Sequence, residues 1–167
     1  QYHYSDTGYV VLGEIITNLA EEPLSSVVRR RTRFAELGLS NTWWERFEQA
    51  PTRAAQRARQ YIYGFDVTDI NATTDLFGGG GLLASTRDMA TFFAALFGNS
   101  PAGGSVFQQP QLQALMVAGD ATPDGYSYRR GIDVWRRDGT LVYSHGGFWG
   151  TAVNHYPDHG ITIAVTV

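Results

Sequence analysis

Tyr4 and Asp6 are the first residues of this sequence that could do chemistry, and they directly precede an apolar helical pattern. The positive N-terminal end of a helix lowers the pKa of a nearby phenol, which makes Tyr4 a candidate general base. In the structural alternative, Tyr4 packs against its neighbours and Asp6 caps the helix. The local residues leave both interpretations open.

The second candidate stretch is His145-Gly146-Gly147, which follows the strand-like residues 140–144. Glycines in a strand remove side chains and often mark a place where a ligand approaches the backbone. A neighbouring histidine can hold a carboxylate or exchange a proton near neutral pH. The alternative is a bulged strand that carries a surface histidine, and it also stays open.

A metal site is suggested at first sight by His155, Asp158 and His159. These residues straddle a turn signal, and their spacing matches no zinc motif. We therefore expect a solvent-exposed hairpin tip, with no metal and no cofactor. The sequence also contains no Gly-x-Ser-x-Gly motif, so spacing alone gives no nucleophile.

Composition narrows the function classes further. The 167 residues are 43% hydrophobic and 17% charged, with a net charge of −3, which is typical of a globular domain and does not favour nucleic acid. A cluster of arginines (29, 30, 31 and 33) is expected to form a solvated helix face rather than a nucleic-acid patch. No apolar run is long enough to span a membrane. Cysteine is absent and all 13 basic residues are arginine, which excludes thiolate and lysine chemistry.

Helical patterns dominate the first two thirds of the chain. Ser5, Asp6 or Thr7 can cap a first helix that Pro23 ends, and its internal glycines, Gly8 and Gly13, predict a backbone passing close by. Further helices are expected over 24–37, after Ser85 with Asp88 in a capping box, and over 109–117. The glycines at 78–81 favour a flexible turn over a nucleotide-binding loop, because no lysine follows them.

The period changes after residue 117 to that of antiparallel strands. Asp138-Gly139 is a strong hairpin signal, the segment 157–160 is another turn, and residues 161–167 alternate like a half-buried strand. Helices followed by a β-meander predict an α+β fold. We expect residues 1–117 to form the helical part of the domain and residues 118–167 its antiparallel strands.

Four phrases in order resemble one known family. "YSDTGYVVLGEII", "AELGLSNTWW", "GGGGLLASTRDMATFFAAL" and the strand-borne "HGG" are similar to segments of the serine β-lactamase and penicillin-binding protein family, in its class C-like branch. "HGG" lies where that family has Lys-Thr-Gly or His-Thr-Gly. Histidine there fits D-alanyl-D-alanine carboxypeptidases, D-amino-acid peptidases and esterases better than true β-lactamases.

The resemblance implies a fold and a set of roles. The fold would be β-lactamase/transpeptidase-like, a helical subdomain beside an antiparallel sheet, and catalysis would be acyl transfer through a serine acyl-enzyme without a cofactor. Tyr4 would be the phenolic base, and Asp6 would stand in the family's asparagine position. His145 would bind a substrate carboxylate or share the proton of Tyr4. Gly146 and Gly147 would line the substrate strand, and the Phe148 N–H would donate to the oxyanion.

The departures from the family shape the remaining expectations. No Ser-x-x-Lys motif exists here, because the chain has no lysine. We therefore expect the carboxyl-terminal part of a larger enzyme, incomplete at both ends, whose partner is the missing amino-terminal part and which is inactive alone. Its substrate would be a small molecule or peptide with an amide, β-lactam or ester bond. The alternative is a non-catalytic binding or sensor relative without the nucleophile. The family implies a periplasmic or extracellular location.

Overall fold

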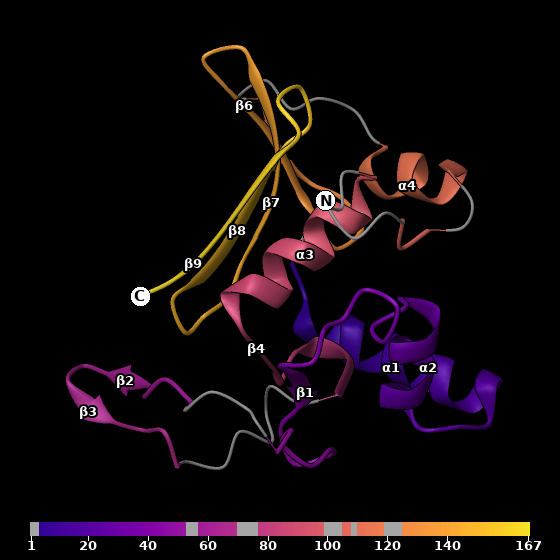
Figure 1. Cartoon of the computed structure of the whole chain (residues 1–167), viewed down its shortest axis with the longest axis vertical. Coiled ribbons are helices and arrows are strands. Elements are labelled where there is room, and N and C mark those ends of the chain that lie inside the picture. Colours follow the sequence, from indigo (N-terminus) through magenta and orange to yellow (C-terminus); the bar gives the residue numbers. More distant parts are fainter. Residues whose placement is uncertain (1–3, 53–56, 70–76, 99–104, 108–109, 119–124) are drawn as a thin grey trace. The chain divides into compact units, whose positions relative to one another are not determined.

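A computed structural model describes residues 4–52, 57–69, 77–98, 105–107, 110–118 and 125–167 (Figure 1). Contacts within the chain divide it into two compact units, Gln1–Ser85 and Thr86–Val167. Among the described residues, the first unit carries two α-helices, a 3₁₀ helix and short strands, and the second carries two α-helices and a larger sheet. The sequence predicted a different division, between helical residues 1–117 and strand residues 118–167. That division separates helices from strands and does not describe compact units, and it stays a prediction.

Helix α1 (Asp6–Ala20) opens the first unit. Ser5 is its N-cap, since the Ser5 hydroxyl accepts a hydrogen bond from the Gly8 N–H at 3.1 Å. The helix ends before Pro23, at Glu21, whose φ of 55° is left-handed and whose N–H donates to the Thr17 carbonyl. The predicted helix is therefore confirmed, but Ser5 rather than Asp6 caps it.

Helix α2 (Leu24–Arg31) is shorter than predicted, because the expected helix over 24–37 breaks into turns after Arg31. Arg33 adopts a left-handed φ of 60°, which an α-helix cannot contain. The side chain of Arg29, a residue of α2, forms an ion pair with Glu48. Its Nε and Nη2 donate to the two carboxylate oxygens of Glu48, at 2.5 and 2.7 Å. The neighbouring arginines also form ion pairs: Arg30 with Glu22, and Arg33 with Glu36.

A glycine contact joins α1 to the 3₁₀ helix η1 (Phe77–Gly79). A Cβ on Gly13 would lie 3.0 Å from Phe77 Cε1 and 3.1 Å from Gly78 Cα, and a Cβ on Gly78 would lie 2.0 Å from the Tyr9 carbonyl oxygen. The predicted close approach of another backbone is confirmed at Gly13. At Gly8, the nearest atoms in the described part of the chain belong to the cap residue Ser5.

The described residues of the first unit also form two short sheets, which were not predicted from the sequence. Strand β1 (Thr42–Trp44) pairs antiparallel with β4 (Leu82–Ala84). Strands β2 (Tyr61–Ile62) and β3 (Phe65–Asp66) form a hairpin. The Asp66 carboxylate accepts hydrogen bonds from the Thr68 hydroxyl and N–H and from Arg59, which together lower the pKa of Asp66 to about 2.

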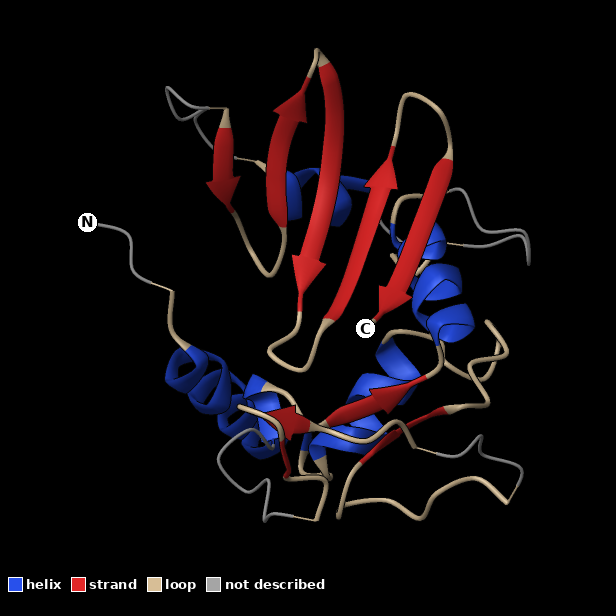
Figure 2. Cartoon of the chain, turned by 90° about the vertical axis from the view of Figure 1, so that its left-hand side faces the viewer, coloured by secondary structure: helices blue, strands red, loops and turns tan. Residues whose placement is uncertain are grey.

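The second unit is a five-stranded antiparallel meander with its strands in chain order (Figure 2). Its strands are β5 (Tyr126–Tyr128), β6 (Asp133–Arg137), β7 (Thr140–Gly146), β8 (Thr151–Tyr156) and β9 (Ile161–Thr166). Helix α3 (Thr86–Leu96) packs on β8 and β9, and α4 (Pro110–Val117) precedes the sheet. The predicted α+β class and β-meander are confirmed. Gln109, the predicted first residue of α4, lies outside the described residues.

Both predicted hairpin turns are present. Asp138 and Gly139 join β6 to β7 with φ values of 50° and 81°, the two left-handed positions of a type I′ turn. The turn between β8 and β9 ends at Gly160, whose φ is 64°. These turns set the register that carries His145 to the far end of β7.

The core of the second unit corrects one expectation. His155 is not part of an exposed hairpin tip: it is fully buried, and its ring stacks on Phe97 with the centroids 4.7 Å apart. Alternation along β8 turns this side chain toward Phe97, the residue that directly follows α3. The hairpin tip itself, with Asp158 and His159, is exposed as predicted.

Candidate active site

Tyr4 and Asp6 lie together at the N-terminus of α1. Tyr4 directly precedes the cap residue Ser5 and is 51% exposed. Asp6 is the first helical residue and is also exposed, where the positive end of the helix dipole favours its carboxylate. Ser5 is the residue that caps the helix, and Asp6 follows it in the first turn, two positions after Tyr4.

His145 lies near the end of β7, half-buried, with both ring nitrogens near hydrogen-bond partners. Its Nδ1 is 2.8 Å from the Gly146 carbonyl oxygen, and its Nε2 is 3.3 Å from the Tyr128 hydroxyl. A carbonyl oxygen only accepts, so Nδ1 carries the proton. In the neutral imidazole, Nε2 therefore accepts from the Tyr128 hydroxyl. Sequence reasoning missed Tyr128, because only the pairing of β5 with β6 brings it near His145.

The two glycines after His145 have different surroundings. A Cβ on Gly146 would meet its nearest atom, the Thr151 carbonyl oxygen, at 3.9 Å, so this position has room for a side chain. A Cβ on Gly147 would lie only 2.1 Å from Thr151 Oγ1. The Gly147 N–H donates to the Thr151 carbonyl at 2.8 Å. Glycine is therefore sterically favoured at 147, whereas position 146 has room for a side chain on the face of β7 opposite to that of His145.

Phe148 is the second residue of the tight turn that joins β7 to β8. The turn is closed by a hydrogen bond from the Gly150 N–H to the Gly147 carbonyl at 3.2 Å, and Gly150 has a φ of 81°. The Phe148 side chain is 81% exposed and meets the ring of Trp149 edge-on, with the centroids 5.0 Å apart. The turn fixes the backbone on both sides of Phe148, as an oxyanion donor requires.

The six predicted site residues thus form two groups, one on each unit. Tyr4 and Asp6 share the N-terminus of α1, and His145, Gly146, Gly147 and Phe148 form one continuous strand end. The approach of the first group to the second stays a prediction. Across the described stretches of the chain, no three His, Asp or Glu side chains are grouped in a way that could hold a metal ion, and no helix is long and apolar enough to cross a bilayer.

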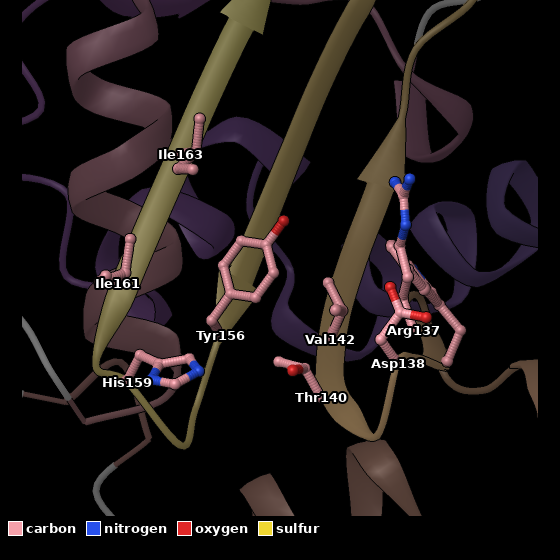
Figure 3. Close-up of a pocket in the computed structure, with 9 residues that line it drawn as sticks. Arg137, Asp138, Thr140, Val142, Tyr156, His159, Ile161 and Ile163 are labelled. Atoms are coloured by element: carbon pink, nitrogen blue, oxygen red, sulfur yellow. The ribbon is translucent and has the colours of Figure 1, made fainter.

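A pocket of about 370 Å³ lies elsewhere in the second unit, on a face of the sheet (Figure 3). Its lining includes Thr140 and Val142 on β7, Tyr156 on β8, and Ile161 and Ile163 on β9. None of the six predicted site residues lines it. His145 lies at the opposite end of β7 from Thr140, so this hollow is separate from the strand end that carries the candidate chemistry.

Comparison with known proteins decides the family. The profile of the family described as beta-lactamase matches residues 1–167. The chain belongs to the beta-lactamase family. No curated protein matches this beta-lactamase-family sequence.

Solved structures share the fold. D-amino acid amidase from Ochrobactrum anthropi SV3 is 26% identical with a TM-score of 0.76, covering 98% of this chain and 50% of its own. A penicillin-binding protein from Bacillus halodurans is 17% identical with a TM-score of 0.77, covering 99% and 52%. An octameric penicillin-binding protein homologue from Pyrococcus abyssi is 20% identical with a TM-score of 0.75, covering 98% and 38%.

These comparisons confirm the family and the fold that the sequence motifs indicated. The family and the structural neighbours are those of hydrolases of the β-lactamase and penicillin-binding protein type. This beta-lactamase-family chain spans about half of the amidase and of the Bacillus protein, and less of the Pyrococcus homologue.

Proposed function

We propose that this chain supplies the general base and the substrate-binding strand of a serine hydrolase that works by acyl transfer. The observation that carries the proposal is the family match over residues 1–167, together with a His-Gly-Gly strand end built as described above. The local geometry supports the roles: Gly147 is closely packed, and the backbone of Phe148 sits in a fixed turn.

The proposed reaction assigns each proton to a group. A serine from outside these 167 residues attacks the substrate carbonyl, and Tyr4 as phenolate takes the serine proton. The carbonyl oxygen becomes an oxyanion that accepts a hydrogen bond from the Phe148 N–H. Tyr4 then returns the proton to the leaving group, which departs and leaves an acyl-enzyme. In the second half of the cycle, Tyr4 takes a proton from the water that attacks the acyl carbonyl and returns it to the serine oxygen, so that the carboxylic acid leaves and the serine is regenerated.

The carboxylate of Asp6 indicates which kind of substrate group this residue would contact. A carboxylate only accepts hydrogen bonds, whereas the asparagine of the family motif can also donate. Asp6 would therefore contact an N–H or ammonium group of the substrate. Because the D-amino acid amidase is 26% identical to this chain, amino acid amides are the first compounds to test, D- and L-phenylalanine amide among them.

The test needs a protein that carries the segment upstream of residue 1, because the 167 residues contain no lysine and so no Ser-x-x-Lys motif. We expect the 167 residues alone to be inactive. We expect one serine of the extended protein to be acylated by a β-lactam or an activated ester, as detected by mass spectrometry. Replacement Tyr4→Phe should abolish this labelling, while His159→Gln, at the exposed hairpin tip, should leave it intact.

Two results would overturn the proposal. One is an upstream sequence without Ser-x-x-Lys, and the other is a folded extended protein in which no serine is labelled. Either result would favour the alternative, a binding or sensor relative that retains the cleft without the nucleophile. Retention of substrate-analogue binding in the unlabelled protein would then identify that alternative directly.

A further inference from the structure

The imidazole of His145 is held from two directions by groups of its own unit. On one side, Nδ1 donates to the carbonyl of the next residue, Gly146, at 2.8 Å. On the other side, the Tyr128 hydroxyl lies 3.3 Å from Nε2. The Tyr128 ring also meets the imidazole edge-on, with the centroids 5.8 Å apart and the planes at 71°. Two hydrogen bonds and a ring contact therefore define both the tautomer and the orientation of this histidine.

Tyr128 reaches His145 through the sheet rather than along the chain. It is the last residue of β5, and its backbone partner on β6 is Asp133, which in turn pairs with Ser144 on β7. The hydroxyl thus crosses from the edge strand to the strand that carries His-Gly-Gly. Tyr126, on the same strand, directs its hydroxyl to the carboxylate of Asp133 instead.

We propose that Tyr128 is a positioning residue that holds His145 as the neutral Nδ1–H tautomer. This inference rests on the proposed function for its catalytic meaning, but its structural content stands alone. With Nδ1 donating to Gly146 and Nε2 accepting from Tyr128, neither nitrogen can donate to a substrate carboxylate unless a hydrogen bond breaks. The arrangement therefore favours the proton-sharing role of His145 over the carboxylate-binding role.

The tautomer can be measured in the 167-residue chain by long-range ¹H–¹⁵N NMR of the histidine side chains, with His145→Gln to assign the signals. We expect one protonated Nδ1 and one unprotonated Nε2 for His145. In Tyr128→Phe, which retains the ring and removes the hydroxyl, we expect the two nitrogen signals to move toward each other as the second tautomer becomes populated. The matched control Tyr126→Phe, on the same strand, should leave both signals unchanged.

The wild-type spectrum decides the matter even if Tyr128→Phe fails to fold: an Nε2–H tautomer at His145 overturns the proposal. An unchanged His145 spectrum in folded Tyr128→Phe also overturns it, as does an equal change in Tyr126→Phe. In the extended protein, Tyr128→Phe should lower kcat by up to about 100-fold and should have no further effect in a His145→Ala background. Absence of any acylation would reject the proposed function and leave the tautomer result standing.

Discussion

At the residue scale, the clearest physical consequence concerns His155. Its ring is enclosed by Phe97 and Tyr143, and Nδ1 lies 2.8 Å from Thr162 Oγ1. Burial lowers the pKa of His155 below its ordinary value of 6.5, because the enclosed site disfavours the charged imidazolium. The unfolded chain therefore binds a proton at this residue more readily than the native chain does.

The sign of the resulting pH dependence follows from that difference. The unfolded state takes up the proton near pH 6.5 and the native state only at lower pH, so the free energy of unfolding should fall as the pH drops below about 6.5. Urea unfolding at pH values between 8 and 5 measures this. His155→Gln should flatten the profile, and His159→Gln should not. An equal slope in the His155→Gln protein would contradict the assignment.

At the element scale, the contact of α1 with η1 depends on a backbone approach that a side chain would block. A Cβ on Gly13 would press at 3.0 Å on both Leu24 Cδ2 and Phe77 Cε1, with Gly78 Cα at 3.1 Å. At Gly8 the nearest atoms belong to Ser5, at 3.6 Å or more. Two glycines of the same helix are thus under different constraints.

This difference gives a matched pair of variants. Gly13→Ala should destabilise the protein by about 1–3 kcal/mol through overpacking. Gly8→Ala should be neutral or stabilise by up to about 1 kcal/mol, since alanine is the better helix former and has room here. Thermal or urea unfolding of both variants checks the prediction. Equal free energies of unfolding for Gly13→Ala and Gly8→Ala would contradict the prediction, because they would show that η1 moves to make room for the added methyl group.

Elements with strong local signals were predictable from the sequence, and elements made by distant pairing were not. Two signals lie within a few residues of the structure that they predict. One is Ser5 ahead of an apolar helical pattern, and the other is Asp138-Gly139 between two alternating strands. By contrast, β1 and β4 are three residues long and pair Thr42 with Ala84 across a long connection, so no local periodicity reveals them. The helix predicted over 24–37 was too long, because nothing in the sequence marks the left-handed φ of Arg33. Tyr128 was missed for the same reason as β1 and β4.

At the scale of the whole molecule, the proposed function requires the two groups of site residues to share one cleft. The absence of cysteine makes this testable, because any introduced pair of cysteines is unique. Asp6→Cys and Gly146→Cys place labels on exposed residues, one in each unit. Arg137→Cys provides a control on the second unit, at the opposite end of β7, roughly 20 Å from Gly146 along the strand.

We expect nitroxide labels at 6 and 146 to give a shorter distance by pulsed electron paramagnetic resonance than labels at 6 and 137. That order follows if Tyr4 and His145 face the same substrate. The reverse order in the folded protein would separate the phenol from the imidazole and remove the shared cleft on which the acyl-transfer mechanism depends.

The unequal surroundings of Gly146 and Gly147 have a practical consequence for anyone who wishes to alter specificity. Position 147 has little room for a side chain, because a Cβ there would lie 2.1 Å from Thr151 Oγ1, which would have to move. Position 146 has room for a side chain, which would lie on the face of β7 opposite to that of His145. A saturation library confined to this one codon would therefore sample new chemistry at the strand end while preserving the scaffold.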